Sequence, residues 1–250
     1  MLKINTGSTN TESETTDSDV VGRFRAGYVV DDEPASLESF RVTTGDASLA
    51  KKIAEELGVD KSKPNDGGPA EWDANGEDFI EVFTKTGSVN VVLDSKGAYR
   101  SSLVRRTRDG DFMYATDGAI ITAVGEDYED EFEVGNPDPQ EGQDVNTRVA
   151  KAKKGLGSSP DIRIRFTLAE HPEWGVFEYR TGGWSLVRNS PEGKLERLGD
   201  GPIKAVLKLV PVNGKRFSYV KPELVVRGLV SDAPKPTIES SDDEDESPIK

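Results

Sequence analysis

The sequence predicts an α+β protein built mostly of antiparallel β-hairpins with one clear amphipathic helix. Short stretches in which apolar and polar residues alternate recur along the chain, and turn residues separate them. Apolar residues at helical spacing stand out only in residues 47–57. Asn-Gly and Asp-Gly pairs, which favour tight hairpin turns, lie between several of the alternating stretches.

Composition limits how much of the chain packs into this fold. Apolar residues make up 34% of the 250 residues, below the roughly 45–50% of typical domains, a figure that also counts glycine. Residues 1–19 and 231–250 are mostly polar, and we expect both to be disordered because they bury too little apolar surface. We expect residues 20–230 to form the core, as one unit or as two subdomains. The subdomains would be residues 20–124 and 160–230, and an acidic insertion, residues 125–159, would separate them.

The net charge of −14 lies in three polar segments. Residues 1–19 carry −3, residues 126–144 carry −9 and residues 231–250 carry −5, which leaves the rest of the chain at +3. A protein that mimics DNA needs carboxylates over its folded surface, so this distribution argues against mimicry. The chain has no cysteine, which excludes disulfides and thiolate metal sites. No apolar run approaches the ~20 residues of a membrane helix, and we expect a cytoplasmic protein.

Alternating residues predict the first strands. Strands are expected at 20–25, 28–30 and 37–44, with a turn at 31–34. Residues 78–84 alternate and lead through Lys85-Thr86-Gly87 into a second apolar stretch at 88–93. We interpret residues 78–93 as a hairpin.

The helix at 47–57 carries signals at both of its ends. Asp46 precedes it, and its carboxylate can accept hydrogen bonds from the free amides of the first turn. Leu49, Ile53 and Leu57 form one apolar stripe. Gly58 supplies the left-handed residue that ends the helix.

The second half contains further hairpin signals. Asp109-Gly110 and Asp117-Gly118 predict turns, and Asn213-Gly214 predicts a hairpin between 203–212 and 217–226. Residues 126–144 have no apolar periodicity and predict a loop. The remaining expectations are a short basic helix at 146–154, a strand at 161–168, and a strand at 175–180 followed either by a pairing strand or by a helix starting near Trp184.

No motif in the sequence predicts a catalytic, cofactor or metal site. His171, the only histidine, stands between Glu170 and Glu173, which can orient an imidazole base, but we favour an exposed loop residue. The acids of 126–133 lack the spacing of a calcium loop. Residues 153–159 are basic and glycine-rich but lack the order of a phosphate-binding loop.

Two sets of residues are candidates for binding. Residues 99–114 combine arginines, among them Arg105 and Arg106, with aromatic residues that can stack on single-stranded bases; the interpretation we favour is the polar face of a half-buried sheet. Tryptophans are more often core than interface. Trp174 stands at an expected turn and is the tryptophan we expect to be exposed as a partner anchor.

Several short blocks, in order along the chain, together resemble one family. They are Val21-Gly22-Arg23-Phe24-Arg25, Arg41-Val42-Thr43-Thr44-Gly45-Asp46, Glu71-Trp72, Gly76-Glu77-Asp78, Glu81-Val82-Phe83-Thr84, Pro160-Asp161-Ile162-Arg163-Ile164-Arg165-Phe166, Gly175-Val176-Phe177 and Gly182-Gly183-Trp184-Ser185-Leu186. This series resembles the recombination directionality factors of actinobacterial temperate phages, the excision partners of large serine integrases. The matched blocks span about residues 20–227.

The resemblance implies a regulatory protein without enzyme activity in the cytoplasm of a bacterial host. It implies binding to a large serine integrase, at its coiled-coil segment, and contact with DNA only through the integrase synaptic complex. We predict Trp72, Trp174, Trp184, Arg105 and Arg106 as partner-binding residues, with no cofactor and no metal. The alternative is a DNA-binding accessory protein of phage replication or recombination that uses residues 99–114.

Overall fold

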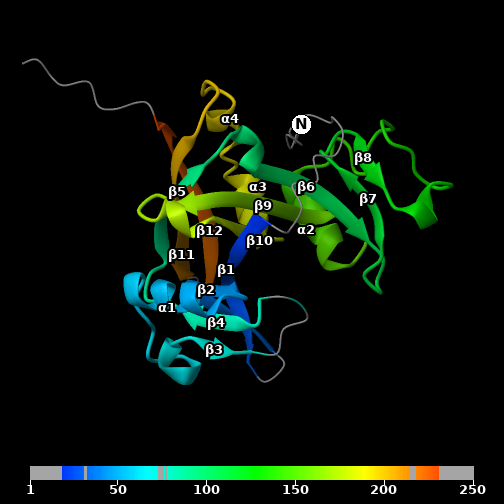
Figure 1. Ribbon diagram of the computed structural model, residues 1–250. Helices are drawn as coiled ribbons and strands as arrows, with labels where there is room; N and C mark the ends of the chain where they lie inside the picture. The colour runs from blue at the N-terminus through cyan, green and yellow to red at the C-terminus, as the bar shows by residue number, and fades with distance from the viewer. Residues whose placement is uncertain (1–18, 31–32, 73–75, 77, 214–217, 231–250) are drawn as a thin grey trace, which may run out of the picture.

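The computed structural model describes residues 19–30, 33–72, 76, 78–213 and 218–230. In these residues twelve strands form one sheet (Figure 1). The strands are β1 (Val20–Val30), β2 (Glu33–Thr44), β3 (Ala70–Glu71), β4 (Ile80–Phe83), β5 (Ser88–Leu93), β6 (Tyr99–Arg106), β7 (Phe112–Thr116), β8 (Ile121–Val124), β9 (Ser159–Leu168), β10 (Val176–Thr181), β11 (Ile203–Asn213) and β12 (Ser218–Leu229). Their order is β12-β11-β5-β9-β10-β1-β2-β4-β3, and β6, β7 and β8 branch from β9.

Strand β9 joins the parts of this sheet. One of its edges pairs with β10. Its other edge pairs first with β6 and then, at Thr167 and Leu168, with β5. Among the described strands only β1 and β10 pair in parallel, so the expectation of a mostly antiparallel fold is confirmed. Strands from 20–124 pair with strands from 160–230, because β1 lies beside β10 and β5 beside β11.

The core forms on one side of β9 and its neighbours. Alternate residues of β9, among them Ile162, Ile164 and Phe166, are buried. Phe24 on β1 lies near the centre, and its ring meets Phe166 and Phe177 edge-on at centroid distances of 5.4 and 5.3 Å. Burial of aromatic side chains supplies a large share of a core's apolar area.

The expectation of one clear helix is wrong, because the described chain contains four α-helices. They are α1 (Ala47–Glu56), α2 (Val145–Lys153), α3 (Trp184–Arg188) and α4 (Glu192–Leu195). Helices α3 and α4 have five and four residues, too few to show the 3.6-residue period. Short 3-10 helices complete the set: η2 (Pro64–Gly67), η3 (Lys96–Ala98), η4 (Glu126–Tyr128) and η5 (Pro172–Trp174).

The prediction of α1 is confirmed at both ends. Asp46 Oδ1 accepts hydrogen bonds from the amides of Ser48 and Leu49 at 2.7 and 3.2 Å. Leu49 and Ile53 are buried, and Gly58 follows the helix with φ of 65°. Trp184 begins α3, so a strand followed by a helix is the correct alternative after β10.

The hairpin predicted at 78–93 is wrong. Strand β4 pairs with β2 and β3, whereas β5 pairs with β11 and β9. The loop between β4 and β5 is hydrogen-bonded to β2 and to β11. The Phe40 amide on β2 donates to the Thr86 carbonyl, and the Leu209 amide on β11 donates to the Gly87 carbonyl. The chain therefore crosses from one part of the sheet to another at Gly87.

The other hairpins form as predicted. Strand β6 pairs with β7, β7 pairs with β8, and β11 pairs with β12 along their full length. Gly214, and the terminal segments expected to be disordered apart from Asp19, lie outside the described residues. None of the described helices is long and apolar enough to span a membrane.

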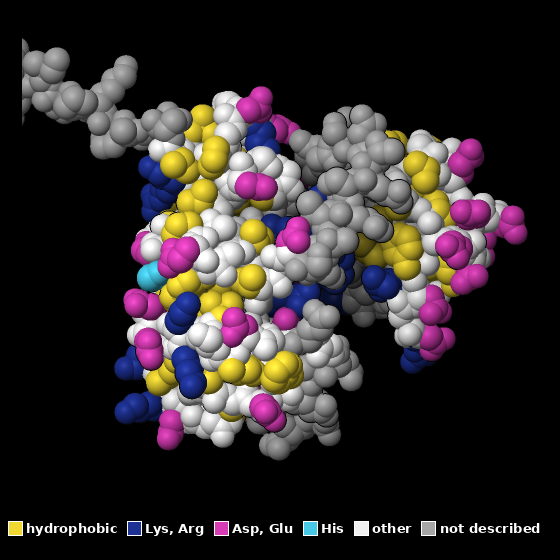
Figure 2. All heavy atoms as spheres, in the orientation of Figure 1, with side chains coloured by type: hydrophobic (Ala, Val, Ile, Leu, Met, Phe, Trp, Pro, Cys, Tyr) yellow, Lys and Arg dark blue, Asp and Glu magenta, His cyan; other side chains and the backbone are white. Residues whose placement is uncertain are grey.

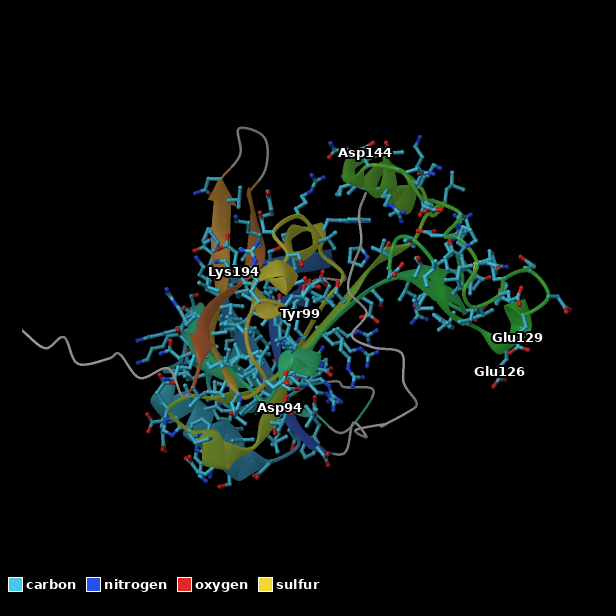
Figure 3. All side chains as sticks on the ribbon, turned by 90° about the horizontal axis from the view of Figure 1, so that it is seen from above. Asp94, Tyr99, Glu126, Glu129, Asp144 and Lys194 are labelled. Carbon is cyan, nitrogen blue, oxygen red and sulfur yellow. The ribbon has the colours of Figure 1, made fainter. Side chains whose placement is uncertain are left out.

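Residues 105–158, here called the arm, project from the rest of the molecule (Figure 1). The arm holds the end of β6, strands β7 and β8, the acidic residues 126–144 and α2. Figure 3 shows Glu126 and Glu129 at the tip of the arm, far from the centre of the sheet. The acidic segment expected as a loop contains only the single 3-10 turn η4.

Candidate functional site

One face of the sheet carries arginine side chains from five neighbouring strands. On β9 the residues between the buried ones point away from the core, and the strand register places the outward residues of β6, β10, β1 and β2 on the same side. Every basic residue in these five strands is arginine. The arginine face consists of Arg23, Arg25, Arg41, Arg100, Arg163, Arg165 and Arg180.

The register places cations side by side in one row of this face. Arg100 on β6 is opposite Arg163 on β9, and Arg163 is opposite Arg180 on β10. Adjacent strands lie about 4.8 Å apart, and like charges directly opposite each other are unfavourable. This row therefore places three guanidinium groups next to one another on adjacent strands.

The next row alternates in sign. Glu178 on β10 lies between Arg165 and Arg23, with oxygen-to-nitrogen distances of 3.6 and 3.9 Å. Arg23 also contacts the Asp78 carboxylate. These contacts fix the centre of the face.

Two further arginines have close carboxylate partners. Arg180 donates to both carboxylate oxygens of Asp161 at 2.7 and 2.8 Å. Arg41 donates to Glu81 at 2.6 Å, and both residues are buried. Such charge-assisted hydrogen bonds hold a guanidinium in a defined orientation.

The remaining arginines have spare donor capacity. Within the described residues Arg25 and Arg100 make no ion pair, and Arg163 reaches only Asp161 at 3.8 Å. Burial, together with the nearby charge of Arg41, lowers the pKa of Arg25 below its usual value. Seven guanidinium groups thus face four carboxylates in the described part of the site: Asp78, Glu81, Asp161 and Glu178.

Trp72 supports the edge of the arginine face. The Arg41 guanidinium lies 4.2 Å from the centroid of its indole, a cation–π distance. The indole Nε1–H donates to the Asp78 carbonyl at 2.7 Å. Trp72 is therefore held in place beside the arginines that it contacts.

Trp174 lines a surface cavity of about 430 Å³ at the start of β10. Its ring stacks on His171 at 4.2 Å, and it is half-buried against the core. The imidazole of His171 lies between Glu56 and Glu173, at 3.6 and 3.4 Å. Glu170 instead accepts a hydrogen bond from Asn90, so it does not orient the histidine. The cavity, here called the tryptophan pocket, also includes Asp46, Lys52 and Asp78.

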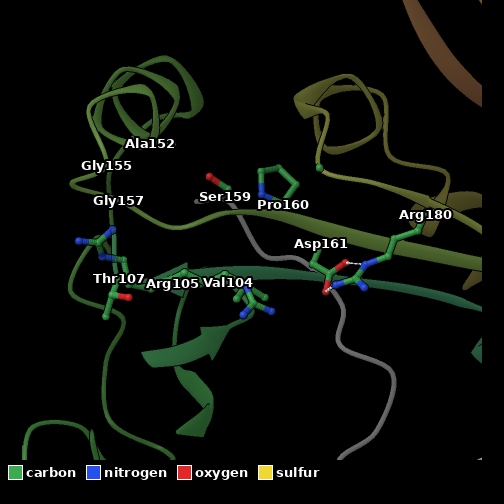
Figure 4. A pocket seen from close by; sticks show the side chains of 12 residues that line it. Val104, Arg105, Thr107, Ala152, Gly155, Gly157, Ser159, Pro160, Asp161 and Arg180 are labelled. Carbon is green, nitrogen blue, oxygen red and sulfur yellow. Dashed lines mark hydrogen bonds and ion pairs between the residues drawn. The ribbon is translucent and has the colours of Figure 1, made fainter. Parts of the chain in front are cut away.

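A second cavity of about 380 Å³ lies where the arm meets the sheet (Figure 4). Arg105 and Arg106 line it, together with the ion pair between Arg180 and Asp161. Three glycines, Gly155, Gly157 and Gly182, also line it. We call it the glycine groove. Figure 2 shows Lys and Arg side chains in the hollow between the arm and the rest of the molecule.

The predicted binding residues therefore occupy different surroundings. Arg105 and Arg106 line the glycine groove, Trp174 lines the tryptophan pocket, and Trp72 borders the arginine face. Trp184 starts α3 and packs against the core. The two cavities lie near opposite ends of β10, with the arginine face between them.

The arginine face itself was not predicted. Its residues come from segments as far apart as Arg23 and Arg180, which only the strand pairing brings together. One local signal was present: Arg23 and Arg25, like Arg163 and Arg165, alternate with apolar residues that point into the core. No group of described acidic or histidine residues is arranged to hold a metal ion.

Comparison with protein-family models gives one match that covers most of the chain. The model is described as Gp3-like, recombination directionality factor-like, and it matches residues 21–226. These residues include every arginine of the arginine face and the whole arm. The comparison with solved structures found no match to this chain.

Proposed function

The chain belongs to the recombination directionality factor-like family, and from this we propose that it binds a large serine integrase and switches it from integration to excision. In excision the integrase recombines the two hybrid sites that flank an integrated phage genome. The proposed place of action is the cytoplasm of the bacterial host. The family match over residues 21–226 is the observation that carries this proposal.

The switch requires no chemistry from the factor. The family is regulatory rather than catalytic. A regulator shifts an equilibrium only by binding one state more tightly than the other. We infer that the factor favours the synaptic arrangement of hybrid sites by contacting the coiled-coil segment of the integrase, and that a ~100-fold preference, about 2.7 kcal/mol, redirects most complexes.

The two cavities are the proposed contact points for the integrase. Aromatic and arginine side chains in pockets supply most of the binding energy at typical interfaces. Trp174 in the tryptophan pocket and Arg105 and Arg106 in the glycine groove have this character. Trp72 and Trp184 contribute as supports, because both are already engaged within the fold.

A pull-down with the cognate integrase tests the binding step. The unaltered protein should retain the integrase, and the Trp174→Ala and Arg105→Ala/Arg106→Ala variants should retain it less. Lys194→Ala is a matched control because Lys194 is exposed on α4, away from both cavities. Failure of the unaltered protein to retain its integrase would sink the proposal.

Direct DNA binding is the second candidate function. Arg100 of the 99–114 region lies in register with Arg163, so this region is part of a larger basic face. A gel shift at low and moderate salt separates the two functions. Tight, salt-sensitive binding of the factor alone to DNA favours an independent DNA-binding protein.

A further inference from the structure

We propose that the arginine face binds the phosphodiester backbone of duplex DNA that the integrase already holds. This inference rests on the proposed function, because the integrase brings the face to the DNA. It adds a second contact, with a different partner, to the contact between the two proteins.

The donor groups of the face suit phosphate. Arginine presents a planar fork of N–H donors that pairs with phosphate oxygens. Arg25, Arg100 and Arg163 have donors that no described carboxylate occupies within hydrogen-bond distance. They come from three strands, β1, β6 and β9, so the free donors are spread across the face rather than gathered at one point.

Carboxylates hold several guanidinium groups of the face in fixed orientations. Glu178 lies between Arg165 and Arg23, and Asp161 anchors Arg180. Because these carboxylates already fix Arg23, Arg165 and Arg180, the side-chain entropy lost on binding falls on the other arginines of the face.

The composition of the face favours DNA over a protein partner. The centre of a protein interface is usually apolar and depleted in charged residues. Here the outward residues at the centre are Arg163, Arg165, Glu178, Arg23 and Thr43. Protein–DNA interfaces are more polar and far more positively charged, and the arginine face has this composition.

The charge of the rest of the chain explains why the contact needs the integrase. The whole chain carries −14, and the arm that borders the hollow carries exposed acids at its tip (Figures 2 and 3). This negative charge opposes encounter of the free protein with DNA. Once the integrase holds the factor, the DNA contact becomes intramolecular, and its effective concentration rises to the millimolar range.

The test compares two binding steps for a triple variant, Arg25→Gln/Arg100→Gln/Arg163→Gln. The first step is binding of the factor to integrase alone, and the second is binding to integrase loaded on hybrid-site duplex DNA. A matched control removes three exposed lysines outside the face: Lys51→Gln/Lys194→Gln/Lys204→Gln. The double variant Arg100→Gln/Arg163→Gln serves if loss of Arg25 prevents folding, since Arg25 is partly buried.

The inference predicts that binding to integrase alone is unchanged, whereas binding to the DNA complex weakens by about tenfold or more. The slope of log affinity against log salt should fall by about 0.9 for each phosphate that the variant no longer neutralises. The control should behave like the unaltered protein.

Two results would overturn the proposed DNA contact and leave the proposed function in place. Equal weakening of both steps, with an unchanged salt slope, would identify the face as a docking site for an acidic protein surface. No change in either step would show that the face contacts nothing in the complex. Absence of binding by the unaltered protein in both steps would overturn the proposed function and the inference with it.

Discussion

The guanidinium of Arg148 and the carboxylate of Asp138 form an ion pair of 2.7 Å in which both side chains are fully buried. Arg148 also donates to the Gly118 and Gln140 carbonyls, at 2.8 and 2.6 Å. These bonds join helix α2, the turn between β7 and β8, and the end of the acidic segment. The arm is thus organised around one arginine.

Arg148→Ala should destabilise the protein by about 3–5 kcal/mol, because it removes the only charged partner of the buried Asp138 carboxylate that the described residues supply and leaves it the Gln140 amide as donor. Urea unfolding followed by circular dichroism measures the change. Lys153→Ala on the same helix is the control, and since Lys153 is exposed it should change stability by no more than about 0.5 kcal/mol. A destabilisation below about 1 kcal/mol for Arg148→Ala would contradict this account of the arm.

Asp46→Ala should cost about 1 kcal/mol, because the amides of Ser48 and Leu49 lose the carboxylate that caps α1. Asp46→Asn should cost much less, since asparagine caps nearly as well. Chemical denaturation compares the two variants. Equal destabilisation by both would show that the cap bonds contribute little.

Gly87→Ala should destabilise by about 1–3 kcal/mol. A Cβ at this position would lie 2.3 Å from the Glu38 carbonyl oxygen, so the backbone crossing between β4 and β5 would have to shift. Gly193→Ala is the matched control, because nothing lies near its added Cβ within helix α4, and it should be neutral or slightly stabilising. Thermal unfolding of both variants checks the contrast, and similar melting temperatures would refute it.

Glu223 should make stability depend on pH in the acid range. Hydrogen bonds from Lys208 and then Lys221 lower the pKa of this carboxyl below its ordinary value of 4.5. The contribution of the ionised Glu223 carboxylate to the free energy of unfolding is fully present above about pH 4.5. It is lost as the pH falls through the lowered pKa.

Glu223→Gln should therefore melt at a lower temperature than the unaltered protein at pH 7, and the difference should shrink as the pH falls below about 4. Glu141→Gln, at an exposed position of the arm, should show no such pattern. A constant difference at all pH values would rule out the carboxylate as its source.

Local signals made α1 predictable from the sequence. The cap Asp46, the stripe of Leu49 and Ile53, and the terminating Gly58 lie within thirteen residues of one another. The turns at Gly110 and Gly118 were predictable for the same reason, since both glycines adopt the positive φ that their hairpins need.

Long-range pairing made the rest of the fold unpredictable. The expected hairpin at 78–93 fails because β5 pairs with β11, more than a hundred residues later. The arginine face depends on the parallel pairing of β1 with β10, which no local pattern indicates. Arg148 stands in a basic helix among lysines, and such a residue is expected to be solvent-exposed until the fold is known to bury it.

The binding role of the candidate residues stays a prediction. Trp174 was selected by its residue type and its expected turn, and Arg105 and Arg106 by their place in residues 99–114; the structure places all three on the lining of a cavity. The contact between Trp72 and Arg41 was not predictable. Arg41 lies thirty-one residues earlier in the chain, and the pairing of β2 with β4 is needed to bring the two side chains together.

A recombination assay with the cognate integrase tests the central claim most directly. Purified integrase is given either the phage and host attachment sites or the two hybrid sites, with and without this protein. The account predicts that the protein permits recombination of the hybrid sites and inhibits joining of the phage and host sites. If it has neither effect while the integrase is active on its own, the protein is not the directionality factor of that integrase and the account is wrong.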